Sequence, residues 1–170
     1  MGKHILSVLV ENYAGVLSRV SGLFSRRGFN IDSLAVGITE NPEVSRMTIV
    51  VDGDDYIVEQ VSKQLNKLVN VIRVKKLDSS NSVSRELALI KVNANASTRS
   101  EIVQIVEIFR AKIVDVSKST LTIEASGDAD KITALEDMLK QFGIREIVRT
   151  GLISIERGNR HIKANNNDEE

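Results

Sequence analysis

The sequence predicts an α+β protein made of two tandem ferredoxin-like domains, each with the element order βαββαβ. Strand-like and helix-like segments follow one another in the same order twice along the chain. Between the two halves lies the serine-rich stretch "SSNSVS", a composition typical of a linker. The 170 residues suffice for two small cores. We therefore expect a first domain at 1–78, a linker at 79–85, a second domain at 86–158 and a mobile tail at 159–170.

The first half carries strand and helix patterns in alternation. The helix over 15–27 is predicted by Val16, Leu17, Val20, Leu23 and Phe24, whose spacing places them on one helical face. A second apolar helical face lies within 55–70, and apolar residues alternate within 30–39. The predicted elements are strand 4–12, helix 15–27, strands 30–39 and 44–52, helix 55–70 and strand 71–77.

The second half repeats this order. A capping box from Thr98 to Glu101 is expected to begin its first helix, because serine or threonine followed three residues later by glutamate pairs with the free N–H groups there. Gly151 is expected to break the last strand region. The predicted elements are strand 86–94, helix 97–111, a hairpin of 112–117 and 121–126, helix 129–142 and a strand region at 145–157.

One face of each predicted sheet has no helix to cover it. In a ferredoxin-like domain both helices pack on the same side of the sheet. The first strand nevertheless carries Val8 and Val10 on one side and Leu9 on the other. We therefore expect a homodimer or a partner subunit to cover the remaining face or the edge of the first sheet.

Composition excludes several classes of function. Lys plus Arg and Asp plus Glu number 23 each, and aromatic residues make up 4% of the chain, so nucleic-acid binding is not expected. Cysteine is absent, which fits a reducing compartment. The first predicted strand begins at His4, and no apolar run reaches the roughly 20 residues of a membrane helix. We expect no membrane contact and a cytoplasmic location, or the plastid stroma if a plastid genome encodes the chain.

The sequence offers no catalytic residues and no metal site. His4 and His161 lack neighbours at metal-ligand spacing, and no nucleophile elbow, Walker loop or dinucleotide fingerprint is present. The acidic run "DGDD" at 52–55 is compatible with a bound cation, but a turn followed by a helix N-cap explains it more simply. These observations favour a binding and regulatory protein.

A candidate ligand site lies in "ENYAGVLSRVSGLFSRRGFNIDSL". Gly15 falls at the predicted helix start, where unpaired N–H groups and partial positive charge suit an anion. Asn12 and Asn30 bracket the helix in sequence. Purely structural roles explain the same residues: Asn12 as an N-cap, Gly15 in a tight turn and Asn30 in the helix exit.

The stretch "ILSVLVENYAGVLSRVSGLFSRRGFNIDSL", followed by "SRMTIVV" and "QLNKLVNVIRV", resembles the ACT domain of the small regulatory subunits of acetohydroxyacid synthase, also called acetolactate synthase. The piece "FRAKIVDV" extends the likeness into the second domain. The resemblance implies a subunit without cofactors of its own. Such a subunit activates a catalytic large subunit that holds thiamine diphosphate, magnesium and FAD, and it confers feedback inhibition by a branched-chain amino acid, usually valine. The alternative is a free-standing ACT-type amino-acid sensor that regulates another protein.

The resemblance also implies an effector site shared by two chains of an ACT dimer, in which the Asn30 position reaches across to the other subunit's loop. Asn12 and Ala14 depart from many ACT domains, which carry an acidic residue and a proline there, so the identity of the effector stays open. Val16, Leu17, Ile31 or Leu34 would supply an apolar wall for a branched side chain. The expected effector-binding residues are Asn12, Ala14, Gly15, Val16, Leu17, Asn30 and Ile31.

Overall fold

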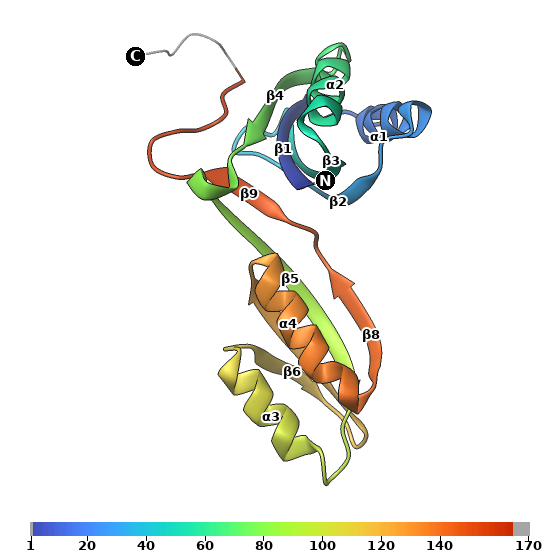
Figure 1. Ribbon diagram of the computed structural model, residues 1–170, viewed down its shortest axis with the longest axis vertical. Coiled ribbons are helices and arrows are strands. Elements are labelled where there is room, and N and C mark those ends of the chain that lie inside the picture. Colours follow the sequence, from blue (N-terminus) through green and yellow to red (C-terminus); the bar gives the residue numbers. More distant parts are fainter. Residues whose placement is uncertain (1, 165–170) are drawn as a thin grey trace. The chain divides into compact units, whose positions relative to one another are not determined.

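The computed structural model describes residues 2–164, which form two compact units (Figure 1). The first unit extends to Val83 and resumes at Leu152, and the second covers Ser84–Gly151. The first unit contains β1 (Gly2–Glu11), α1 (Val16–Arg27), β2 (Ile31–Ile38), β3 (Val44–Gly53), α2 (Asp55–Asn66), β4 (Val71–Leu77), the 3-10 helix η1 (Ser79–Asn81) and, after the second unit, β9 (Ile153–Glu156).

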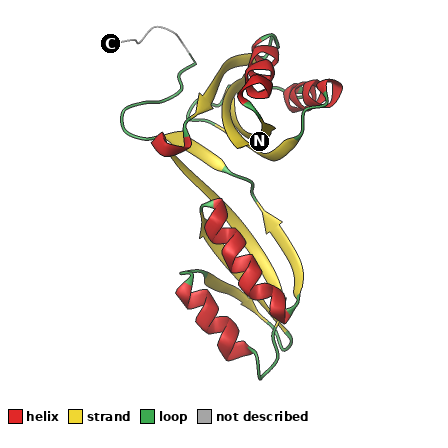
Figure 2. Ribbon diagram, in the orientation of Figure 1, coloured by secondary structure: helices red, strands yellow, loops and turns green. Residues whose placement is uncertain are grey.

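The sheet of the first unit has the strand order β2-β3-β1-β4, and its neighbouring strands are antiparallel. Helices α1 and α2 pack on one face of this sheet (Figure 2). Alternate residues of β1 and β3 join the apolar faces of both helices in one core. The buried core consists of Leu6, Val8, Val10, Val16, Val20, Leu23, Phe24, Met47, Ile49, Val51, Val58, Val61 and Leu65.

The second unit repeats this architecture with the strand order β6-β7-β5-β8. Its core is again formed by one sheet face and two helices, with Ile90, Ile123 and Leu135 among the fully buried side chains. The predicted pair of ferredoxin-like βαββαβ domains is therefore confirmed. The elements are β5 (Ser82–Asn93), α3 (Arg99–Ile108), β6 (Lys112–Val116), β7 (Thr120–Gly127), α4 (Ala129–Leu139), η2 (Lys140–Phe142) and β8 (Ile144–Arg149).

The segment that follows the first predicted domain forms a short 3-10 helix and the start of a strand. Where a linker was expected at 79–85, the Asp78 carboxylate accepts a hydrogen bond from the Ser80 N–H over 2.9 Å and starts η1. Strand β5 then begins directly at Ser82. Aspartate and serine favour such local hydrogen bonds, so this polar composition produces a capped turn. Of the tail expected at 159–170, residues 165–170 lie outside the described part of the chain.

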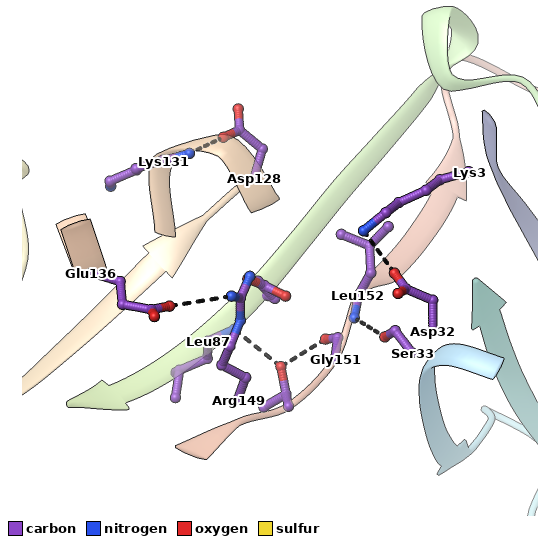
Figure 3. Close-up of polar contacts among 12 residues, drawn as sticks. Lys3, Asp32, Ser33, Leu87, Asp128, Lys131, Glu136, Arg149, Gly151 and Leu152 are labelled. Carbon is purple, nitrogen blue, oxygen red and sulfur yellow. Dashed lines mark hydrogen bonds and ion pairs between the residues drawn. The ribbon is translucent and has the colours of Figure 1, made fainter. Parts of the chain in front are cut away.

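Residues from Leu152 onward pack on the first unit. The Leu152 N–H donates to Ser33 Oγ over 3.0 Å (Figure 3). Arg46 Nη2 donates to the Ser154 carbonyl oxygen over 3.0 Å. The Lys75 ammonium pairs with Glu156 at 2.7 Å. We call residues 152–157 the C-terminal strap.

The strap lies on the sheet face opposite α1 and α2. Arg46 pairs with Leu9 across the β1–β3 ladder, and Lys75 pairs with Ser7 across the β1–β4 ladder. These positions alternate with Val8 and Val10, which point toward the helices. Ser7 and Leu9 are buried, and β9 contacts both β1 and β4. The strap covers part of this face, and a homodimer or partner subunit at the sheet or its edge stays a prediction.

Of two predicted helix N-caps, the structure confirms one and contradicts the other. The Asp54 carboxylate accepts a hydrogen bond from the Ile57 N–H over 2.9 Å, which confirms the N-cap interpretation of the acidic run. The capping box at Thr98 is wrong, because the Thr98 side chain does not cap α3. Asn95 Oδ1 instead accepts from the N–H groups of Ser97 and Thr98.

Candidate functional site

Gly15 is the N-cap of α1 and has a left-handed backbone with φ 90°. A methyl group placed on its Cα would meet no heavy atom within 4 Å, so space does not demand a glycine. The positive φ favours a glycine, because any other L-residue there is strained by about 1–2 kcal/mol. This backbone lets the chain turn from Tyr13 into the helix, whose first hydrogen bond runs from the Arg19 N–H to the Gly15 carbonyl.

The N-terminal end of α1 is open to solvent and has no side-chain cap. No side chain accepts a hydrogen bond from its first turn, and that turn holds no acidic residue. Ala14, Gly15 and Leu17 are exposed around it, whereas Val16 is buried in the core. The Val16 N–H donates to the Tyr13 carbonyl over 3.4 Å, and the other N–H groups of the first turn and its partial positive charge suit an anionic group.

Asn12 holds the β2–β3 loop against the end of β1 by hydrogen bonds. Its Nδ2 donates to the Pro42 carbonyl over 2.9 Å, and its Oδ1 accepts from Ser45 Oγ over 3.1 Å. Its backbone N–H donates to the Glu43 carbonyl. The interpretation of Asn12 as an N-cap of α1 is therefore wrong. Because an amide oxygen has two lone pairs, Oδ1 can accept one more hydrogen bond beside the helix start.

Asn30 and Ile31 lie after the other end of α1. The helix is closed by a left-handed Gly28, whose N–H donates to the Ser25 carbonyl, and by the Phe29 N–H, which donates to the Phe24 carbonyl. This pair of bonds is a Schellman motif. Asn30 follows it as an exposed residue, and Ile31 begins β2 half-buried.

The structure does not bring all the expected site residues together within one chain. Helix α1 has 12 residues, so about 18 Å separates its two ends. Strand β3 gives a second measure of this separation. Asn12 binds Glu43, directly before the strand begins at Val44, whereas Ile31 pairs with Val51, which lies about 23 Å along the strand from Val44. Asn12 and Gly15 thus form one half of the candidate site, and Asn30 and Ile31 form the other.

Arg46 follows Ser45 on β3 and binds the strap, a contact that was not predicted. It is half-buried, and burial lowers the pKa of its guanidinium below the usual value, although the carboxylates of Glu156 and Glu40 partly offset this effect. Its Nε is buried without a hydrogen-bond partner among the described residues. No local spacing indicates this contact, because Arg46 and Ser154 lie 108 positions apart.

The described residues contain neither a metal-binding cluster nor a membrane-spanning helix. Within 2–164, the His, Asp and Glu side chains form no group of three or more that would hold a metal ion. None of the helices in this part of the chain has the length and the apolar character needed to span a bilayer.

Two family models match the chain, one to each half. The model described as "AHAS small subunit-like ACT domain" matches residues 6–73, and the model "Small subunit of acetolactate synthase" matches residues 85–158. The acetolactate synthase small subunit of Mycolicibacterium smegmatis is 60% identical over 161 residues, which cover 95% of each chain. The probable acetolactate synthase small subunit of Archaeoglobus fulgidus is 57% identical over 93% of this chain and 99% of its own.

A solved structure agrees with these sequence matches. The crystal structure of the acetolactate synthase small subunit from Thermotoga maritima superposes with a TM-score of 0.88 at 46% identity, covering 94% of this chain and all of that one. The likeness therefore includes both units and the length of the chain as well as the ACT half. This chain belongs to the family of acetolactate synthase small subunits.

Proposed function

We propose that the chain is a non-catalytic regulatory subunit that activates a catalytic acetolactate synthase large subunit and makes it sensitive to a branched-chain amino acid, with valine as the first candidate. Its relatives are named as small subunits, which implies a large-subunit partner. In this proposal thiamine diphosphate, magnesium and FAD belong to the large subunit. The role of this chain is to bind the end product and change the activity of its partner.

The observation that carries the proposal is the uncapped start of α1 at Gly15. A free amino acid offers a carboxylate, which the first N–H groups of the helix would bind. Its ammonium group would donate to the remaining lone pair of Asn12 Oδ1, next to the Ser45 hydroxyl. Leu17 is 45% exposed at the same place and would contact a branched aliphatic side chain.

A homodimer would complete this site with residues from the second chain. Strand β2 is an edge strand of its sheet, and it exposes Val36 and Ile38 by 47% and 66%. Ile38 pairs with Ser45, which binds Asn12, so the end of β2 lies at the Gly15 half of the site. Antiparallel pairing of two β2 strands about a twofold axis would place the start of the partner's β2 beside this end. The partner subunit's Asn30 would then face Gly15.

Reconstitution with an acetolactate synthase large subunit tests the proposal. We expect the large subunit alone to be weakly active, and to gain activity when this chain is added. We then expect valine to lower the gained activity, with leucine and isoleucine titrated in parallel to identify the effector. A large subunit whose activity does not respond to this chain would contradict the proposal and favour an amino-acid sensor that acts on another protein.

A further inference from the structure

The strap is held on the first sheet by polar contacts. Ser154 and Glu156 point toward the sheet, where the Ser154 carbonyl accepts from Arg46 and Glu156 pairs with Lys75. The alternating residues Ile153 and Ile155 are more than half exposed. In a strand that docks through apolar side chains, the isoleucines would instead face the sheet. Directional polar bonds therefore contribute to holding the strap, together with the backbone pairing of β9 with β5.

Two anchors of the strap lie next to residues of the candidate effector site. Ser33, which accepts from the Leu152 N–H, lies on β2 three positions after Asn30. Arg46 lies on β3 directly after Ser45, whose hydroxyl donates to Asn12. Each half of the site therefore lies within a few residues, along one strand, of a residue that binds the strap.

The strap is also covalently continuous with the second unit. Strand β8 ends at Arg149, and Gly151, with φ 78°, precedes Leu152. Two residues, Thr150 and Gly151, separate the end of β8 from the strap, so a change in how the strap sits on β2 and β3 can be passed along the chain to β8.

We propose that the strap couples the effector site to the second unit. Binding at Asn12 and Gly15, completed by the partner subunit's Asn30, shifts the strands that carry Ser33 and Arg46, and the strap contacts change with them. The coupling rests on the proposed function, because it explains how occupancy of that site reaches the rest of the chain. It separates two properties of the subunit: the ability to bind the effector and the ability to respond to it.

Three substitutions weaken the strap contacts without touching the effector-site residues. Arg46→Met removes the donor to Ser154, Glu156→Gln removes the charge that pairs with Lys75, and Ser33→Ala removes the acceptor for Leu152. Matched controls lie on α2, where Lys63→Met breaks an exposed pair with Glu59 and Ser62→Ala removes a hydroxyl that donates to Val58. Valine binding to the full chain is measured by calorimetry, and valine inhibition is measured on the holoenzyme with the large subunit.

We expect the strap variants to bind valine nearly as wild type, and the concentration for half-inhibition to rise at least about fivefold. The α2 controls should match wild type in both assays. Wild-type inhibition in all three strap variants would overturn the coupling. Loss of binding together with inhibition would also overturn it, because the strap would then only support the site. A wild-type chain that binds no valine, leucine or isoleucine would overturn the proposed function as well.

Hydrogen exchange on the wild-type protein provides a test that no misfolded variant can obscure. The backbone N–H groups of Leu152 and Arg157 donate to Ser33 and to the Asn81 carbonyl, so their exchange reports the state of the strap. We expect valine to change exchange in the peptide spanning 152–157 and to leave α2 unchanged. Unchanged exchange in this peptide at saturating valine would overturn the coupling.

Discussion

The Arg46 guanidinium donates a hydrogen bond to the Ser154 carbonyl oxygen over 3.0 Å, joining residues 108 positions apart. The first unit is therefore discontinuous in sequence, because its sheet is covered by a strap that the chain reaches only after completing the second unit. Any experiment that separates the halves at the boundary near residue 80 also removes this strap.

Truncation after Val83 should give a fragment that keeps part of its activation and loses most of its valine response. Removing the strap uncovers the buried face at Leu9, and exposing one such side chain costs about 1.5–3 kcal/mol. We therefore expect a lower unfolding temperature than for the full chain, measured by calorimetry. Replacing residues 84–151 by a glycine-serine linker restores the strap and should recover stability but not valine inhibition. A fragment as stable as the linked chain would show that the strap contributes little.

The exposed edge of β2 predicts a dimer at micromolar concentration, which light scattering would detect. Val36→Glu and Ile38→Lys should yield monomers, because a charge at the centre of an apolar strand interface is costly to bury. Val114→Glu on β6 is the control, since Val114 is similarly exposed but lies in the second unit. A strictly monomeric wild-type chain would contradict both the dimer and a site shared by two chains.

Acid should weaken η1 through Asp78. The pKa of this carboxyl is lowered because the Ser80 hydroxyl and the Ser80 N–H donate to it. A carboxyl with a depressed folded pKa stabilises the fold above its unfolded pKa, and this stabilisation is lost as the pH falls through the folded pKa. We expect exchange of the Ser80 N–H to rise below about pH 4, measured by NMR. Asp78→Asn, which keeps an acceptor oxygen but cannot titrate, should remove this rise.

Much of the fold follows from local pattern. The predicted strand 71–77 coincides with β4, and the predicted apolar face of α1 is buried except at Leu17. The strap was missed because its polar contacts join residues 81 to 119 positions apart, which leaves no periodic signal. Sequence also could not fix the role of Asn12, because an asparagine before a helix can cap it or bind a neighbouring loop equally well.

Gly15→Asp should abolish valine inhibition and leave activation in place. The aspartate puts a side chain and a negative charge where the ligand carboxylate would bind. The left-handed backbone adds a strain of about 1–2 kcal/mol, which any non-glycine residue would share. Gly15→Asn is the matched control, because asparagine is nearly isosteric, neutral and more tolerant of this backbone. Holoenzyme activity against valine concentration should show a much weaker defect in Gly15→Asn. Equal defects in both variants would assign the effect to strain or bulk.

Mixing two inactive variants provides the sharpest test of a shared site. Gly15 and Asn30 lie at opposite ends of α1, about 18 Å apart in one chain, so a single small ligand contacts both only across two chains. We expect Gly15→Asp and Asn30→Ala each to abolish valine inhibition of the holoenzyme.

A heterodimer of these two variants holds one site with both changes and one with neither, because the Asn30→Ala chain contributes its Gly15 and the Gly15→Asp chain contributes its Asn30. Chains unfolded together and refolded as a mixture should therefore recover part of the valine inhibition and bind about one valine per heterodimer. Refolding each variant alone is the control and should recover neither. A mixture as insensitive as its components would place both residues in the same site of one chain, or place the effector elsewhere, and the two-chain site would be wrong.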